Sequence, residues 1–363
     1  MKKILPILFL VVISSIVHAN QDSDSIKHKN KPVPFLDTNY VARYKDRLVV
    51  SLYQSYRHYN FDFWQTGITD TLGLSRMNYK THSNHSTGFG IDYDKISFSL
   101  GWKSPVDEKD EKTKGITKTF NLAFSLNGKR HRIETSIRSF QGFYDDDLIK
   151  YGLPINDSSI HYQDPSMHLQ EYRGKFFWFF NKKKRFSYAA AYSNTQRQLK
   201  SAGTLLLISN VYGFRIQSDT GMVPLPASPM FGTDANINGF RSIGISLNPG
   251  FSYNLVLFKR LFANATFSWG PELQFRKISH KDGIEKTSID LGLSALDYRG
   301  SIGYNGKYFY IYWFIMGDVN AFDPQNLSMV KSMIYQGGIF GYRFKFENKF
   351  TKWLQANKIY SWI

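Results

Sequence analysis

The chain has 363 residues, no cysteine, 17% aromatic residues and a formal net charge of +17. Without cysteine it can form no disulfide, no thiolate metal site and no lipoprotein anchor, which needs a cysteine at its cleavage point. The basic charge would suit a nucleic-acid partner, but the sequence has no stacking motif and no compact basic helix, so we expect no nucleic acid.

The N-terminus predicts two segments that precede the folded domain. Lys2 and Lys3, an apolar run over residues 4–17 and a small-residue cleavage site ending in Ala19 are typical of a secretory signal peptide. An N-terminal membrane anchor would need a longer apolar run. Residues 20–46 are predicted to form a polar periplasmic leader, and residues 47–363 a single domain.

The rest of the chain predicts β-strands, because apolar and polar residues alternate and no further run of about 18 apolar residues could form a membrane-spanning helix. A first strand is expected from Arg47 through Phe63, followed by a polar segment at 65–86. One hairpin turns at Asp94-Lys95 and another at Asn127-Gly128, a dipeptide typical of tight hairpin turns. Further strands are expected at 171–180, 186–197, 203–217, 285–303, 307–320 and 329–347, with loops at 107–114 and 141–166.

The clearest alternation lies in a long hairpin from Phe240 to Gly270, which turns at Lys259-Arg260. From Ile243 to Leu257 the odd positions are apolar apart from Pro249, and the even positions between them are mostly Ser, Gly and Asn. A period of two places these groups on opposite faces. One alternative is a half-buried strand pair in a soluble sandwich. We favour membrane-spanning strands with lipid outside and an aqueous lumen inside.

Counting the strands predicts a closed antiparallel up-and-down barrel of about 12 strands, if residues 185–217 form one long strand that is kinked near Ser201-Ala202-Gly203. If 185–217 divides and residues 353–363 add a strand, the number becomes about 14. An even number places all the short turns on one side. Pro249 removes a ladder donor and predicts a local bulge.

The segment from Tyr308 to Met316 is apolar on both faces. Its length matches the roughly 9–11 residues of a tilted membrane strand. We expect it to pack on lumenal side chains or a plug, in preference to binding a partner.

Charged residues at alternating positions predict the content of the lumen. Opposite charges on neighbouring strands would pair with one another. One interpretation is a constriction that selects anions, since basic residues outnumber acids; the other is a salt-bridge lattice that plugs or rigidifies a narrow barrel. The candidate lumen residues are Arg132, Glu134, Arg138, Glu171, Arg173, Lys175, Arg343, Lys345 and Glu347.

Other polar groups give weaker indications of chemistry. A hydrolase would need a nucleophile beside a base, and His131 with Ser136 or His168 with Ser166 are the nearest candidates in the sequence. Neither pair belongs to a Gly-x-Ser-x-Gly motif. The pair His82 and His85 lacks further metal ligands, and Asp145-Asp146-Asp147 lacks the rest of a calcium loop. We therefore predict no catalytic residue, metal site or cofactor.

Four segments carry a resemblance to a known family. They are Asp37-Thr38-Asn39-Tyr40-Val41, Asp46-Arg47-Leu48-Val49-Val50, Gly142-Phe143-Tyr144 and the run from Gln198 to Thr204, which contains Lys200, Ser201, Ala202 and Gly203. With these motifs the chain, from about Phe35 to Phe346, resembles the bacterial family of the domain of unknown function 4421. The resemblance implies a secreted outer-membrane-type barrel. It implies no activity and no catalytic residues.

Three functions are compatible with these observations. The first is an outer-membrane pore, transporter or envelope scaffold with a basic lumen, whose partners would be outer-membrane lipid and an anionic solute or lipopolysaccharide. The second is a barrel enzyme acting on envelope lipid. The third is a soluble periplasmic all-β binding protein. The sequence leaves the oligomeric state open.

Overall fold

A computed structural model describes residues 36–67, 75–82, 85–105, 107–146, 160–323 and 326–357, and these residues belong to one compact unit, Phe35–Ile363. The predicted signal peptide with its cleavage after Ala19, residues 20–35 of the predicted leader, Asp147 and the terminal Trp362-Ile363 lie outside the described residues. Among the described residues no helix is long and apolar enough to cross a membrane.

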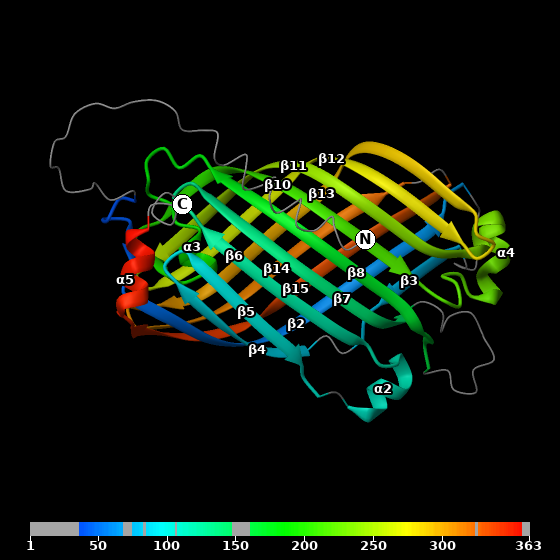
Figure 1. Cartoon of the computed structure of the whole chain (residues 1–363), viewed down its shortest axis with the longest axis horizontal. Helices are drawn as coiled ribbons and strands as arrows, with labels where there is room; N and C mark the ends of the chain where they lie inside the picture. Colours follow the sequence, from blue (N-terminus) through cyan, green and yellow to red (C-terminus); the bar gives the residue numbers. More distant parts are fainter. Residues whose placement is uncertain are drawn as a thin grey trace. The chain divides into compact units, whose positions relative to one another are not determined.

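Long antiparallel strands make up most of the unit (Figure 1). The strands are β1 Val41–Arg43, β2 Arg47–Gln65, β3 Arg76–Lys80, β4 His85–Tyr93, β5 Ile96–Lys103, β6 Lys118–Asn127, β7 His131–Asp145, β8 Tyr162–Phe179, β9 Gln196–Gln198, β10 Ala202–Gln217, β11 Ile237–Leu257, β12 Leu261–His280, β13 Glu285–Asn305, β14 Phe309–Phe322 and β15 Leu327–Lys345. The helices are α2 Glu108–Lys114, α3 Ala189–Tyr192, η2 Leu225–Ala227, α4 Ser228–Phe231, η3 Gly232–Asn236 and α5 Lys349–Ala356.

The main sheet closes on itself, because β15 pairs with β2 along their whole length, from Leu327↔Gln65 to Lys345↔Arg47. The sheet contains 13 strands, of which β3 and β4 both lie beside β2 and share one place in the ring. Twelve places remain (13 − 1), with even parity as the sequence predicts. The chain therefore forms a closed antiparallel up-and-down transmembrane β-barrel.

The two ends of the barrel differ in their connections. One end carries the short turns at 94–95, 128–130, 258–260 and 306–308, and we call it the short-turn end. At the other end β7 ends at Asp145, β8 begins at Tyr162, and the loop 218–236 joins β10 to β11. We call it the long-loop end. β2 begins and β15 ends at the short-turn end, where Arg47 is paired with Lys345.

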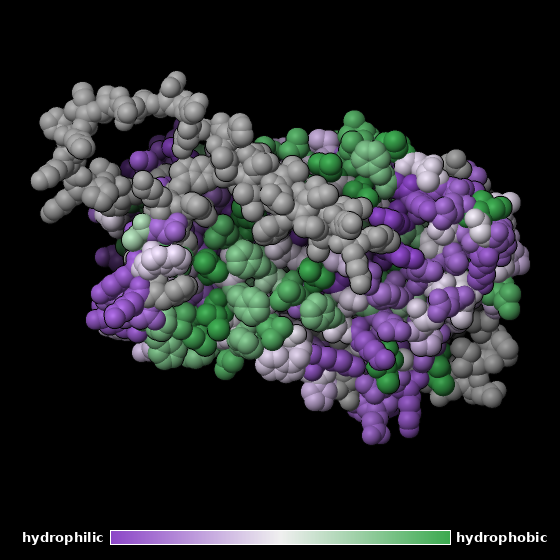
Figure 2. All heavy atoms as spheres, viewed as in Figure 1, coloured by the Kyte–Doolittle hydropathy of each residue, from purple (hydrophilic) through white to green (hydrophobic). Residues whose placement is uncertain are grey.

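The predicted hairpin Phe240–Gly270 forms the central part of β11 and β12, with Leu257 directly opposite Leu261. On β11 the odd side chains are exposed on the outside, with Ile245 45% and Leu247 51% exposed, while Ser246 between them is 1% exposed. Figure 2 shows hydrophobic side chains gathered over the strands and hydrophilic ones toward the ends. The outer surface is thus apolar and the inner surface polar, as the alternation predicts.

A positive charge in the middle of this outer surface should destabilise the barrel in lipid. Leu247 is the central residue of β11, and Leu247→Arg is expected to lower the free energy of unfolding in phospholipid vesicles by about 2–4 kcal/mol. Leu225, which is 88% exposed on η2 in the 218–236 loop, provides a matched control. Leu225→Arg should change the folding free energy by less than about 0.5 kcal/mol. Equal effects of the two substitutions in urea titrations would contradict a lipid-facing β11.

Residues 185–217 do not form one kinked strand, which corrects the prediction. Residues 180–201 between β8 and β10 fold into the barrel as a plug that contains α3 and β9, and β10 begins only at Ala202. Ala189, Ala190 and Ala191 are all buried in succession, so this segment has no alternating exposed face. The barrel still has twelve strand places, because the plug connects β8 to β10 in place of a short turn. The alternative of 14 strands is also wrong, since residues 349–356 form helix α5.

Residues 36–46 do not belong to a polar leader, which is a second correction. Leu36, Val41 and Tyr44 are buried, and β1 pairs with β9 of the plug, with Val41 opposite Gln198. Their apolar side chains occur without strand periodicity, so the sequence offered no pattern that would assign them to the barrel. A further helix, α2, occupies the predicted loop at 107–114 and has no buried residue.

The bulge predicted at Pro249 is absent, because β11 and β12 keep one register there, with Ser246 opposite Glu272 and Gly250 opposite Ser268; the ladder is interrupted instead. The ladder between β11 and β12 is interrupted from Leu247 to Pro249, and a bulge between Gly270 and Glu272 follows on the other side of β12. Pro249 and Pro271 each lack the backbone N–H that a ladder hydrogen bond requires. Pro271, between Gly270 and Glu272, extends the break to the ladder between β12 and β13.

Candidate functional site

The lumen is filled by three successive layers of side chains. Toward the long-loop end lies an apolar layer of aromatic and methionine side chains from at least eight strands, roofed by Met222, Val223, Ala227 and Phe231 of the 218–236 loop. Its ring contacts include Phe61 with Phe214 at 5.8 Å and Phe240 with Phe322 at 5.2 Å between centroids. This layer is a core of ordinary protein type inside the barrel. It was not expected from the alternation of the strands, which predicts a polar lumen.

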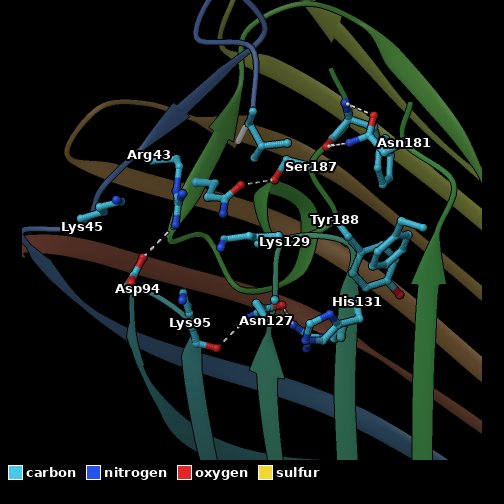
Figure 3. Close-up of a pocket in the computed structure, with 17 residues that line it drawn as sticks. Arg43, Lys45, Asp94, Lys95, Asn127, Lys129, His131, Asn181, Ser187 and Tyr188 are labelled. Atoms are coloured by element: carbon cyan, nitrogen blue, oxygen red, sulfur yellow. Dashed lines mark hydrogen bonds and ion pairs between the residues drawn. The ribbon is translucent and has the colours of Figure 1, made fainter. Parts of the chain in front are cut away.

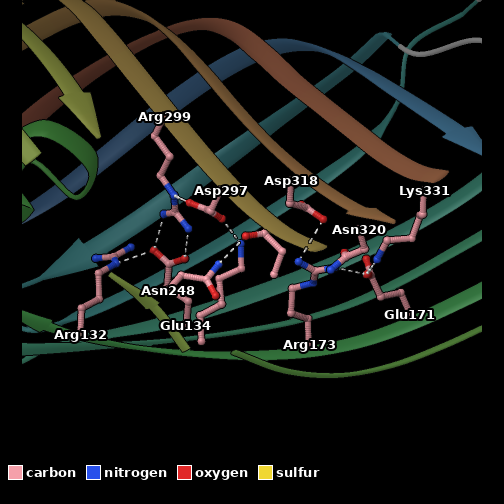
Figure 4. Close-up of polar contacts among 12 residues, drawn as sticks. Arg132, Glu134, Glu171, Arg173, Asn248, Asp297, Arg299, Asp318, Asn320 and Lys331 are labelled. Carbon is pink, nitrogen blue, oxygen red and sulfur yellow. Dashed lines mark hydrogen bonds and ion pairs between the residues drawn. The ribbon is translucent and has the colours of Figure 1, made fainter. Parts of the chain in front are cut away.

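The middle layer is ionic, and it contains six of the predicted lumen residues. Figure 4 shows four of them, Arg132, Glu134, Glu171 and Arg173. Glu134 binds Arg132 at 2.6 Å and Arg299 at 2.8 Å. Asp297 binds the same Arg299 at 3.0 Å and also forms an ion pair with Lys175. Each of these carboxylates thus contacts two cations, and Arg299 links the two pairs into one chain of charges.

The other half of this layer centres on Glu171, which is 0% exposed. Glu171 accepts hydrogen bonds from Arg138 at 2.8 Å and Arg173 at 2.6 Å, and it forms an ion pair with Lys331. Asp318 binds Arg173 at 3.0 Å and Arg138 at 3.6 Å. We call the ten residues of both halves the lattice: Arg132, Glu134, Arg138, Glu171, Arg173, Lys175, Asp297, Arg299, Asp318 and Lys331.

The lattice crosses the lumen. Strands β7 and β8 are neighbours on one side of the ring and β13, β14 and β15 on the other, separated by three strand places in one direction and four in the other. The contacts of Glu134 with Arg299 and of Glu171 with Lys331 join these two walls directly. At this level the lumen is therefore only as wide as two opposing side chains.

Four lattice residues were missing from the sequence prediction: Asp297, Arg299, Asp318 and Lys331. Each is a charged residue in a strand with an apolar outer face. Each also lies at an inward position, an even number of residues away from other buried residues of its strand. A search for charges at inward positions of every predicted strand would have found them. Their partners could not be predicted in this way, since the contacts connect residues up to 165 positions apart.

A cavity of about 230 Å³ lies between the lattice and the wall formed by β4, β5 and β6. Its wall consists of small inward residues such as Gly90, Ser99 and Ala123. Arg57 of β2 also lines it, with its guanidinium 4.5 Å from the Tyr335 ring and its Nε without a hydrogen-bond partner. The lattice is thus packed tightly on one side only.

The plug forms the third layer, at the short-turn end, and Arg343 holds it in place. This side chain is 1% exposed and donates to the Asn194 carbonyl at 2.8 Å, to the Gly306 carbonyl at 2.7 Å and to Asn305 Oδ1 at 2.7 Å. Its guanidinium also lies 4.6 Å from the Tyr44 ring. One buried cation therefore connects the plug, a turn and the N-terminal segment.

Of the three predicted residues on the last strand, only Arg343 lies in the lumen. Lys345 ends β15 and is exposed, and Glu347 lies beyond the strand, where it is exposed and 3.6 Å from Lys352. The prediction assumed that alternation continued past the end of the barrel wall. The segment Tyr308–Met316 has the predicted packing, since Tyr310, Tyr312 and Phe314 are buried inside.

The segment Lys200-Ser201-Ala202-Gly203 is the junction between the plug and β10. Lys200 lies 5.4 Å from the ring of Tyr40, and Ser201 Oγ accepts a hydrogen bond from the Val256 amide at 2.9 Å. A Cβ at Gly203 would lie 2.7 Å from the Tyr253 ring, so the junction needs glycine there. The two motif segments that begin at Asp37 and Gln198 thus lie together at the short-turn end.

The members of the candidate Ser–His pairs contact other residues of the described chain. Ser166 Oγ donates to Asp164 at 2.6 Å, whereas His168 Nε2 lies 3.2 Å from Ser139 Oγ. Both Ser139 and His168 have outward parity on their strands. His131 stacks on the Phe176 ring at 5.8 Å.

The candidate metal-binding segments have protein partners. His82 Nδ1 lies 2.7 Å from the Gly115 carbonyl, and the ring of His85 contacts that of Tyr56. Asp145 accepts from the Asn78 amide at 2.9 Å, and Asp146 pairs with Lys80 at 2.5 Å. Within the described residues no group of three or more His, Asp or Glu side chains could hold a metal ion.

Several solved barrels resemble the structure at low sequence identity. The outer membrane protease OmpT from Escherichia coli matches with 8% identity and a TM-score of 0.36, over 85% of this chain and 100% of that one. An outer membrane channel from Pseudomonas putida F1 matches with 8% identity and a TM-score of 0.31, over 85% and 99% of the two chains. The P. putida toluene transporter TodX matches with 9% identity and a TM-score of 0.26, over 83% and 91%.

Comparison with curated protein sequences gives no significant match. The sequence profile of one family, described as a domain of unknown function (DUF4421), matches residues 36–344. This range covers every strand of the barrel except the last residue of β15, and it includes the N-terminal segment that packs on the plug. The chain therefore belongs to the DUF4421 family of β-barrel proteins.

Proposed function

We propose that this protein is a closed barrel of the bacterial outer membrane that serves as an envelope scaffold and does not form an open pore. The short-turn end would face the periplasm, since short turns lie on that side of bacterial barrels. The observation that carries the proposal is the lattice, whose ion pairs join opposite walls of the barrel at mid-height.

The lattice argues against an anion-selective constriction. Such a constriction needs cations that a passing anion can reach and leave again. Here Arg132 is already paired with the carboxylate of Glu134, and Arg173 and Lys331 are paired with that of Glu171. An ion passing through the lattice would have to separate buried pairs, and removing one partner of such a pair costs about 3–5 kcal/mol.

The other two layers support the same proposal. The apolar core toward the long-loop end contains buried aromatic rings in mutual contact, which leaves a hydrated ion no polar surface to follow. At the short-turn end Arg343 binds the plug inside the barrel wall. A solute would thus meet three filled layers in succession, and opening a pore would require all three to move.

The alternatives fit the observations less well. A soluble binding protein would not expose a belt of large apolar side chains such as Leu247, Phe267 and Ile302 around its outer face. An enzyme on envelope lipid would need a nucleophile with an oriented base. The Ser139–His168 pair is the nearest approach to that arrangement, and no carboxylate of the described residues forms an ion pair with His168.

Conductance measurements test the proposal directly. The refolded chain, inserted into planar lipid bilayers, is expected to give no stable ohmic current above that of the empty bilayer. A 16-stranded porin, which has an aqueous channel, serves as the positive control for insertion and detection. Insertion of the chain itself is checked by protease protection of the same bilayer lipids as vesicles. Uniform open-channel steps from the wild-type chain would contradict the proposal.

A further inference from the structure

A cavity of about 220 Å³ lies at the short-turn end, next to the lattice residue Arg132 (Figure 3). Four separate parts of the chain surround it. They are the N-terminal segment with Arg43 and Lys45, the β4–β5 turn with Asp94 and Lys95, the β6–β7 turn with Asn127 and Lys129, and the plug with Asn181, Ser187 and Gln196. The proposed scaffold role assigns no task to this cavity.

The lining of the cavity is strongly basic. Five cations, Arg43, Lys45, Lys95, Lys129 and Arg132, face one carboxylate, Asp94, which gives an excess of four positive charges (5 − 1). Arg132 is paired with Glu134 of the lattice, and Arg43 is paired with Asp94. A concave site lined by one sign of charge concentrates the opposite ion.

The neighbouring protein groups compensate these cations only in part. Arg43 reaches Asp94 at 3.3 Å, and its buried Nε has no hydrogen-bond partner. No carboxylate of the described residues forms an ion pair with Lys129. Burial lowers the pKa of Lys95 to about 8; Asp94 opposes this shift, while Lys129 and the cations of the N-terminal segment add to it. The site therefore stores positive charge that an anion would stabilise.

The neutral polar groups that line the cavity already donate to protein acceptors. Asn127 Nδ2 donates to Ser193 Oγ at 3.0 Å, and Ser187 Oγ donates to Gln196 Oε1 at 2.7 Å. An anion in the cavity would therefore be bound by the charged donors. Arginine and lysine side chains are the usual donors of a phosphate site.

We propose that this cavity binds a phosphate or related oxyanion group, held between Arg43, Lys95 and Lys129. Its volume is below the roughly 300–1,000 Å³ of sites for drug-sized ligands, so it admits an anionic head group or a small free anion. Because Arg43 comes from the N-terminal segment and the other two cations from the barrel turns, the bound anion would link that segment to the barrel. The site shares Arg132 with the lattice but none of the three proposed anion-binding residues, so it could bind an anion whether or not the barrel conducts.

The experiment uses the full chain folded in a zwitterionic detergent and inorganic phosphate as the probe in titration calorimetry. Lys95→Gln combined with Lys129→Gln is expected to weaken phosphate binding at least tenfold. Lys182→Gln combined with Lys183→Gln is the matched control, because these exposed lysines lie at the same end and do not line the cavity. The control should change the affinity less than twofold. Lys129→Gln alone, at an exposed position, serves if the double variant fails to fold, and should weaken binding at least threefold.

Two further titrations identify the source of the anion. The first uses short-chain phosphatidylglycerol below its micelle concentration, and the second uses glycerol phosphate. If the chain binds phosphatidylglycerol at least tenfold more tightly, the ligand is a lipid head group. Equal binding of the two would identify a free solute, and either result supports the site. Undetectable phosphate binding by the wild-type chain, or equal losses in the cavity and control variants, would overturn it. Neither outcome bears on the conductance test, so the two proposals can fail separately.

Discussion

Replacing Glu171 by glutamine is expected to lower the free energy of unfolding by about 3–5 kcal/mol, because it removes one partner of a fully buried ionic cluster. Glu171 and Lys331 are both 0% exposed, and Arg138 and Arg173 also bind this carboxylate. Glutamine keeps the size of the side chain but leaves three cations with Asp318 as their remaining carboxylate. Urea-induced unfolding in phospholipid vesicles, followed by tryptophan fluorescence, measures the change.

Glu347→Gln is the control for this substitution. Glu347 carries the same charge, but it is exposed and its nearest partner, Lys352, lies 3.6 Å away at the surface. Surface pairs contribute about 0–1 kcal/mol, so this variant should unfold almost as the wild-type chain does. If Glu171→Gln were equally mild, the mid-lumen charges would be hydrated and the lattice would not close the barrel.

Arg343→Met is expected to lower the free energy of unfolding by at least about 4 kcal/mol and to release the plug. The substitution removes three charge-assisted hydrogen bonds, to Asn194, Asn305 and Gly306, each of the class worth about 1.5–3 kcal/mol. It also leaves their buried acceptor atoms without a donor. Limited proteolysis within residues 185–201 should become several times faster in the variant, while the barrel strands remain resistant.

Lys345→Met is the matched control for the plug. It removes the same charge from the same strand, two residues further along, where the side chain is exposed at the rim. We expect a change below about 0.5 kcal/mol and an unaltered cleavage pattern. Equal sensitivity of the plug in both variants would mean that Arg343 has no specific part in holding it.

The barrel wall follows from local patterns, which explains why it could be predicted. Alternation in β11 determines which side chains face outward, since successive residues of a strand point to opposite sides whatever the strand pairs with. The predicted strands at 203–217, 285–303 and 307–320 therefore agree with β10, β13 and β14 to within two residues. The prediction was wrong at 185–201. Residues 186–191 of this segment are buried in succession inside the barrel, so their apolar and polar positions do not alternate as in a strand of the wall.

The sequence by itself determined that this chain forms a closed barrel with an apolar exterior, because the facing of strand residues is a property of the local backbone. Only the tertiary structure decided that the barrel is filled, and with what. Glu171 and Lys331 are 160 positions apart, and the plug meets Arg343 across 149 positions. Such contacts depend on how a ring of twelve strands closes and on the width that closure leaves between opposite walls.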